Sequence, residues 1–361
     1  MKTKRIFLAL AAASISVAAV AQTSQKITAG KANEYGLAYS LPQTVVDLYI
    51  EAQLEEHHPG EFHNYAKRYL GTNDAIHEDG YSAEVVGVTI VPRGIATDEN
   101  RQLAQFRNGT SAYINLTPEN LPTGINTDEI YNAAMPQIPV AKPAAPSPLD
   151  GPGAQQAVTA EMARSSSLAK KAELAAQRIF ELRETRSDIL SGNADNPPAD
   201  GAAMELVLNN LAAQEAALTA MFQGVTTKRT VVKKITVEPD TAEVQTVARL
   251  SAIDGIIDPD NLAGAPVTVS FTVLEQGKLP VNEKGETKTY PKGGVAYCIP
   301  GMALVTVNYA GKKVAEADLP LAQLGVVFGL NPSLFTDRRE PYKAVFDTTT
   351  GAVVNLAPMA Q

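Results

Sequence analysis

The alternation of apolar and polar residues changes its period twice along the chain. Residues 44–56 alternate with a period of two, which is typical of a strand with one buried face. Residues 165–223 instead repeat apolar residues at steps of three and four, which is typical of amphipathic helices. After residue 225 the period of two returns. The pattern therefore predicts strands at 44–56, 82–96, 111–116 and 267–273, and further pairs of strands within 303–320 and 342–358.

The helical segment predicts two long helices, each with an apolar seam that one charged residue interrupts. The first seam comprises Leu168, Ala172, Ala175, Ile179, Leu182, Arg186 and Ile189, and the second comprises Met204, Leu208, Leu211, Glu215, Leu218 and Phe222. Gly192 and Gly224 suit the ends of these helices, and Asp200 suits the N-cap of the second. Two such helices joined by a short turn predict an antiparallel helical hairpin.

The charged seam residues Arg186 and Glu215 predict ion pairs between the two helices. A buried charge without a partner is unfavourable, so each residue is expected to find one. A symmetric turn near residues 196–197 places Arg178 opposite Glu215 and Glu205 near Arg186. We therefore expect the pairs Glu215–Arg178 and Arg186–Glu205, each worth about 0–1 kcal/mol.

Strands on both sides of the helices predict an α+β protein that is mainly antiparallel β. Its domains are expected to be sandwich-like or open barrels, with the long helical hairpin between them. Six prolines between residues 135 and 153 are typical of an extended linker. The predicted organisation is a signal peptide at 1–21, a β-rich domain with one short helix at 22–134, a proline-rich linker at 135–153, the helical hairpin at 154–224 and a C-terminal β domain at 225–361.

The first 21 residues have the pattern of a secretory signal peptide. Lys2, Lys4 and Arg5 precede an apolar run that closes with small residues at Ala21. The run is short and rich in alanine, so a membrane-spanning helix is not expected. No cysteine follows the cleavage point, so a lipoprotein is not expected either. We predict an exported protein that begins at Gln22 and resides in the periplasm or at the outer membrane.

The charge of the chain argues against nucleic acid as a partner. The formal charge is −8, and it becomes about −11 once the signal peptide is removed. An acidic chain without a basic stripe is poorly suited to nucleic acid. The densest basic patch, Lys228, Arg229, Lys233 and Lys234, is interpreted as flanking an edge strand, where lysines oppose pairing with other chains. The single cysteine, Cys298, lies in an apolar run, which predicts a buried and inert thiol.

The histidines are the best candidates for chemistry in this sequence. His57, His63 and His77, with Glu61 as a base, would suit a metal-dependent hydrolase. A zinc site on one helix needs ligands at i and i+4, and the residue one turn after His63 is Lys67. We therefore expect histidines in a solvated turn, no cofactor and a non-enzymatic protein.

Two other motifs have local explanations. Ser167 and Lys170 fit the S-x-x-K pattern of penicillin-binding enzymes, but the partner motifs are missing. Asp254, Asp258 and Asp260 lack the spacing of an EF-hand loop, and aspartate before glycine or proline suits a turn.

The opening of the mature chain carries two motifs, Tyr-x-Leu-Pro in YSLPQTVVDLYIEAQ and Tyr-Ala-x-x-Tyr-Leu-Gly in PGEFHNYAKRYLG. Together they resemble an uncharacterised exported family from Bacteroidetes bacteria, a domain of unknown function. The matching residues are Tyr39, Leu41, Pro42, Gly60, Phe62, Tyr65, Ala66, Tyr69, Leu70 and Gly71. The helical segment and the closing TTGAVVNL resemble the same family, so the resemblance covers nearly the whole mature chain. It implies no known activity.

The sequence leaves three functional hypotheses open. The first is an envelope protein that contacts envelope or outer-membrane proteins through residues 165–223, as an interaction or structural component. The second is a glycan- or peptide-binding module, although a chain without tryptophan offers few platforms for stacking on sugars. The third is the metal-dependent hydrolase. Thr241 and Thr348 fit the short Asp-Ser/Thr-aliphatic signal of the same bacteria, which makes them candidate O-glycosylation sites.

Overall fold

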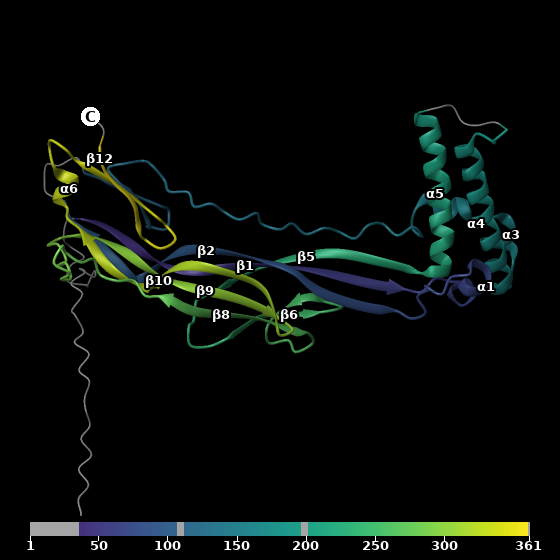
Figure 1. Ribbon diagram of the computed structural model, residues 1–361, viewed down its shortest axis with the longest axis horizontal. Helices are drawn as coiled ribbons and strands as arrows, with labels where there is room; N and C mark the ends of the chain where they lie inside the picture. The colour runs from purple at the N-terminus through teal and green to yellow at the C-terminus, as the bar shows by residue number, and fades with distance from the viewer. Residues whose placement is uncertain (1–35, 107–111, 196–200, 360–361) are drawn as a thin grey trace, which may run out of the picture.

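The computed structural model describes residues 36–106, 112–195 and 201–359, and the predicted signal peptide at 1–21 lies outside them. The described chain consists mostly of antiparallel sheets, with a curled half-barrel sheet and a smaller helical part. The molecule is long, and most helices gather at one end of a ribbon of strands (Figure 1). The mainly antiparallel β character predicted from the sequence is therefore confirmed.

The ribbon has three antiparallel strands in the order β2–β1–β5. They are β1 (Leu37–His58), β2 (Gly80–Ala104) and β5 (Val225–Val237). β1 has 22 residues, so it extends for about 70 Å at about 3.3 Å per residue. β1 and β2 are longer than the predicted strands at 44–56 and 82–96. The reason is that backbone pairing continues past the point where side chains stop alternating.

A five-stranded antiparallel sheet in the order β10–β9–β8–β6–β7 packs against the ribbon. Its strands are β6 (Gln245–Ser251), β7 (Gly255–Ile257), β8 (Ala265–Glu275), β9 (Val295–Tyr309) and β10 (Lys312–Leu330). The predicted strand at 267–273 is β8, and the predicted pair within 303–320 belongs to β9 and β10.

The core between these two sheets is apolar and continuous. Val46, Leu48 and Ile50 of β1 alternate with polar residues and lie at 0% exposure. They belong to the same buried cluster as Val267 and Val269 of β8, which are equally buried. The period of two in the sequence therefore corresponds to one face of each strand turned into this core.

A third sheet in the order β12–β11–β4–β3 lies at the end of the molecule opposite most of the helices (Figure 1). Its strands are β3 (Ile114–Leu116), β4 (Pro122–Ile125), β11 (Tyr342–Phe346) and β12 (Val353–Pro358). The predicted strand at 111–116 is shorter, and Ser111 lies outside the described residues. β4 pairs with β11, just as β5 pairs with β1. Two sheets thus combine strands from both predicted β regions, because pairing partners are not encoded in local periodicity.

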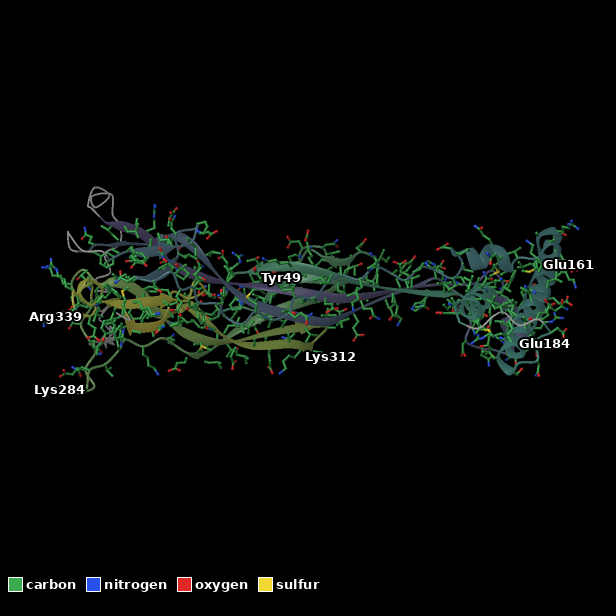
Figure 2. All side chains as sticks on the ribbon, turned by 90° about the horizontal axis from the view of Figure 1, so that it is seen from above. Tyr49, Glu161, Glu184, Lys284, Lys312 and Arg339 are labelled. Carbon is green, nitrogen blue, oxygen red and sulfur yellow. The ribbon has the colours of Figure 1, made fainter. Side chains whose placement is uncertain are left out.

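The helices are η2 (His63–Tyr65), α1 (Ala66–Leu70), α2 (Pro152–Ala157), α3 (Ala160–Arg164), α4 (Leu168–Ser191), α5 (Ala202–Gln223) and α6 (Ser333–Thr336). We name α1 to α5 the helical head and the three sheets the β body. In Figure 2, Glu161 and Glu184 lie in the helical head, and Lys284 and Arg339 lie at the opposite end of the molecule. Phe62 and Phe222 fill the core of the head, with their ring centroids 5.3 Å apart.

The predicted seam is buried in the middle of α4 and toward the C-terminal end of α5. In α4, Ala172, Ala175 and Ile179 are fully buried, whereas Leu168 is 43% exposed. Gly192 caps α4 with a left-handed backbone, as predicted. In α5, Leu218 and Phe222 are buried and Gly224 follows the helix. The N-cap of α5 is Gly201, so the predicted N-cap Asp200 is wrong by one residue. The turn at 196–200 lies outside the described residues.

The predicted ion pairs Glu215–Arg178 and Arg186–Glu205 are wrong in their partners. Glu215 Oε1 lies 2.6 Å from Arg183 Nε, and Glu215 Oε2 lies 3.4 Å from Arg186 Nη1. Arg178 instead pairs with Glu181 on its own helix, at 3.1 Å. The prediction paired residues at equal distances from the turn. Helical side chains lean toward the N-terminus of their helix, and the prediction did not take this lean into account. When neighbouring helices run in opposite directions, the lean shifts each pairing toward higher residue numbers.

The proline-rich segment runs extended along the ribbon (Figure 1) and bonds to it at one position. Lys142 N donates to Thr230 O at 3.0 Å, and Thr230 N donates to Lys142 O at 2.9 Å. Thr230 belongs to β5, so this bridge covers part of the free edge of the ribbon. The segment ends at Pro152, the first residue of α2, where proline is favoured because its missing N–H has no helical partner.

Candidate functional site

The surface between α4 and α5 is the best candidate for a contact site. A hollow of about 530 Å³ is lined by Arg183, Arg186, Ser187, Leu190, Ser191 and Glu215. Three large apolar side chains of the same two helices are exposed, Phe180 by 52%, Leu190 by 65% and Leu206 by 70%. The Arg183 guanidinium lies 5.8 Å from the centroid of the Phe180 ring. The helical head thus presents apolar side chains beside guanidinium groups.

The charges at this hollow do not balance. The Glu215 carboxylate is largely covered, with 18% of its side chain exposed, and both Arg183 and Arg186 share it. The two arginine side chains remain about half exposed. Two guanidinium groups on one carboxylate leave an excess of positive charge, which favours an acidic group from outside.

A close backbone contact fixes the helical head to the ribbon. Phe62 N donates to Met221 O at 2.7 Å, and Ile76 N donates to Gln223 O at 2.9 Å. A Cβ atom at Gly60 would overlap with the carbonyl group of Met221. Only glycine therefore allows the chain that leaves β1 to lie so near the end of α5.

Two histidines lie at the end of β1 rather than in the predicted turn. His57 Nδ1 lies 2.9 Å from Thr226 Oγ1, and His58 Nδ1 lies 2.8 Å from Asp79 Oδ1. Backbone pairing with β5 continues through both residues, which is why the strand ends later than predicted. Consecutive strand residues face opposite sides of a sheet, so the two rings point apart.

The other two histidines come together, but they do not complete a metal site with His57. The rings of His63 and His77 lie edge to face, with their centroids 5.5 Å apart. His63 Nδ1 lies 2.8 Å from Gly60 O, so this nitrogen donates its proton to the carbonyl. Within the described ranges, no group of three or more His, Cys, Asp or Glu side chains is placed to hold a metal ion.

The sequence analysis did not predict a charged cluster that lies on the solvent-facing side of the ribbon. The Asp47 carboxylate on β1 accepts from Arg93 Nε at 3.0 Å and from Thr236 Oγ1 at 2.6 Å, and it lies 2.8 Å from Lys234 Nζ. Burial acts to raise the pKa of this carboxyl, and these three donors outweigh it, so that the pKa falls to about 2. Lys234 also lies 5.8 Å from the Tyr49 ring centroid. The cluster binds three strands together and keeps Asp47 ionised.

Three of the other sequence motifs have structural roles. The Cys298 thiol is buried as predicted, and burial raises its pKa to about 12, which disfavours the reactive thiolate. Ser167 is the N-cap of α4, and its side chain accepts from Lys170 N at 3.4 Å. Asp254 accepts from Ser251 Oγ at 3.3 Å, and Asp258 lies 2.9 Å from Lys233 Nζ. Each of these groups therefore interacts with a neighbouring residue of the fold.

The fold and its surface define an elongated, mainly antiparallel β protein that carries a helical head with an exposed apolar and basic surface. The chain belongs to the family described as Domain of unknown function (DUF4831), which matches residues 35–354. No curated protein and no solved structure matches the chain. The predicted resemblance to a domain of unknown function is thus confirmed. In the parts of the chain that the structure describes, every helix is too short or too polar to cross a membrane.

Proposed function

We propose that this protein is an exported, non-enzymatic component of the cell envelope that binds other envelope proteins through α4 and α5. The observation that carries the proposal is the exposure of Phe180, Leu190 and Leu206 on these helices. Phe180 lies beside Arg183, and Leu190 lines the hollow with Arg183 and Arg186. Apolar side chains beside arginine are typical of the centre of a protein interface. This surface supports a role as an interaction or structural component.

The chemistry of the hollow suggests what the partner presents. Arg183 and Arg186 share the single carboxylate of Glu215, and Leu190 lines the same hollow. A partner segment that combines an apolar side chain with a carboxylate would fill the hollow and neutralise the second guanidinium. Such charge pairing sets the orientation of an interface more than its affinity.

The shape of the molecule supports a contact role. The ribbon carries the helical head at one end of the molecule, far from the third sheet at the other (Figure 1). The close contact at Gly60 fixes the head to the ribbon. A rigidly mounted head reaches a partner without the loss of conformational freedom that a flexible tether would suffer on binding.

Export to the periplasm or the outer membrane rests on the pattern of the first 21 residues. The mass of the protein purified from its native cells tests this part of the proposal. We expect a mature chain that begins at Gln22, and a chain that retains Met1 would contradict export through this signal.

Charged substitutions on the head test the contact role without disturbing its core. Leu190→Asp and Leu206→Asp replace exposed side chains, so both variants should fold. Leu262→Asp is the matched control, because Leu262 is 78% exposed in the β body. Affinity capture from envelope fractions should recover the same proteins with wild type and with the control, and the two head variants should lose at least one of them.

Identical protein lists from wild type and both head variants would contradict docking through α4 and α5. Circular dichroism of each purified variant provides the control for folding. A variant with reduced helicity would be replaced by Phe180→Asp, which changes a different exposed residue of α4.

A further inference from the structure

A second recess lies in the β body, where two strands leave their pairing at the same place. β2 pairs Arg101 with Ser40 and then Ala96 with Pro42, so residues 97–100 are an excursion opposite Leu41. β10 makes a similar excursion, because Leu321 pairs with Gly301 and Val326 pairs with Ile299. Such irregularities are concentrated near functional sites, where they redirect side chains.

The two excursions enclose a hollow of about 390 Å³ that is bounded by β1, β2, β9 and β10. Its polar lining comprises Gln43, Glu99, Asn100, Gln102, Cys298 and Gln323. The volume falls within the range of about 300–1,000 Å³ that is usual for small-molecule sites. This hollow lies near the start of β1, whereas the helical head follows its end, so the two sites are far apart.

Polar groups at this place lack partners within the protein. Gln102 is 4% exposed, and no hydrogen bond joins its side-chain amide to any residue in the described ranges. In the neighbouring excursion the Thr97 hydroxyl oxygen is buried and also has no partner. Polar groups inside a protein are nearly always hydrogen-bonded, and the free Gln102 amide faces the hollow, where a bound molecule can complete its bonding.

The remaining lining groups limit the chemistry of that ligand. The Gln323 amide is already hydrogen-bonded within the protein, because its Nε2 donates to Thr44 O at 2.6 Å and its Oε1 accepts from Thr44 N at 3.2 Å. The Cys298 thiol is protonated and donates to Ala322 O at 3.7 Å, so it is no nucleophile. Lys, Arg and His do not line the hollow, and Glu99 is its one carboxylate.

We propose that this hollow binds a neutral polyhydroxylated molecule the size of a monosaccharide or disaccharide. The side-chain amides of Gln43, Asn100 and Gln102 each offer a donor beside an acceptor, which suits neighbouring hydroxyl groups. The lack of basic lining disfavours phosphates, and a single carboxylate disfavours divalent cations. Strands on all sides favour a compact molecule over an extended peptide. No aromatic residue lines the hollow, so hydrogen bonds provide the specificity.

Titration of the mature protein with maltose, lactose, cellobiose and diacetylchitobiose tests this proposal. The side-chain amide resonances of protein labelled with ¹⁵N-glutamine report on Gln102 directly. At least one sugar should shift the Gln102 signal in a saturable way. Gln102→Leu should weaken that binding at least about tenfold, because the lost amide leaves sugar hydroxyls unpaired. Gln155→Leu, an exposed glutamine of α2, is the matched control and should bind as wild type.

Two results would overturn the proposal. The first is that none of the four sugars binds with a Kd below about 10 mM. The other is a shift of the Gln102 signal by N-acetyl-dialanine amide but not by any sugar, which would make the hollow a peptide site. Thermal unfolding adds a second readout that does not depend on the sugar chosen. Gln102→Leu should raise the melting temperature, and a marked decrease would show that the amide already has a structural partner.

Discussion

The β body and the helical head are built in opposite ways from the same chain. In the β body, β1 pairs with β5 and β4 pairs with β11, so its sheets join residues more than a hundred positions apart. The helical head assembles mainly from residues 152–223, with Phe62 and α1 added from the segment that follows β1. The body therefore depends on long-range pairing, and the head depends on local packing around one joint.

The two parts also differ in how the charged side chains on their surfaces are paired. On the ribbon, cations meet carboxylates: Lys228 lies 2.6 Å from Glu55, and Lys234 lies 2.8 Å from Asp47. On the head, two arginines share Glu215, and Leu190 and other apolar side chains are exposed. Exposed apolar side chains occur on both parts, Leu262 of the body among them. The head differs because its exposed Leu190 lies beside two arginines that share one carboxylate, which suits a contact. This difference supports our proposal that the head docks on a partner and that the body is its scaffold.

Truncation of one core residue in each part should produce the largest effects. Phe222→Ala removes a buried ring from the head and is expected to lower its stability by about 3–5 kcal/mol. Leu48→Ala removes a buried side chain from the body and is expected to lower its stability by about 2–5 kcal/mol. Hydrogen exchange measured by mass spectrometry should localise each loss to its own part. Equal loss of protection in both parts from either variant would show that head and body unfold as one unit.

Gly60→Ala should loosen the joint between head and body. The new Cβ overlaps with the carbonyl group of Met221, which is backbone and has no room to yield. We expect a loss of about 2–3 kcal/mol, with increased hydrogen exchange in residues 60–76 and 215–223. Gly87→Ala is the matched control, since a Cβ there meets nothing within 4 Å. Similar behaviour of the two variants would contradict the close contact at the joint.

The Asp47 cluster should make the ribbon sensitive to acid. Its hydrogen bonds to Arg93, Lys234 and Thr236 lower its pKa from the ordinary value of 3.8 to about 2 in the folded protein. A lowered carboxyl pKa stabilises the fold at pH values above about 4, and this stabilisation is lost as the pH falls toward 2. Asp47→Asn should reduce stability at pH 7 by about 1–3 kcal/mol and by much less at pH 2. Urea unfolding at both pH values measures this, with the exposed Asp258→Asn as control. A constant difference between Asp47→Asn and wild type would contradict an ionised Asp47.

Glu215→Leu should have the smallest effect on stability. The variant loses two ion pairs with half-exposed arginines, each worth about 0–1 kcal/mol, and it gains an apolar contact. The melting temperature is therefore expected to stay near that of wild type, while capture of envelope proteins changes because the hollow becomes more basic. A severe loss of stability would show that Glu215 is an essential buried partner.

Much of the fold follows from local patterns in the sequence. The alternation around Val46 and Leu48 predicts a half-buried strand, and the structure confirms it. Gly192 and Gly71 end helices with left-handed backbones, because their missing Cβ removes the strain of that conformation. These features depend only on neighbouring residues, so the sequence alone is sufficient to predict them.

Strand partners and side-chain pairings could not be read in the same way. Nothing near Tyr342 or Pro122 indicates that β11 pairs with β4. Asp47 reads as one polar residue among several on its strand, and its cluster exists only once β2 and β5 bring Arg93 and Lys234 beside it. The hollow at Gln102 likewise arises where two distant strands leave their pairing together, which local periodicity does not record.

Site-specific photo-crosslinking in living cells tests the docking role of the helical head most directly. A photoreactive amino acid placed at Leu190 or Leu206 should form a discrete crosslinked product with an envelope protein. The same probe at Leu262, exposed on the β body, should form none. Adducts confined to Leu262, or the absence of adducts at both head positions, would contradict the assignment of docking to α4 and α5.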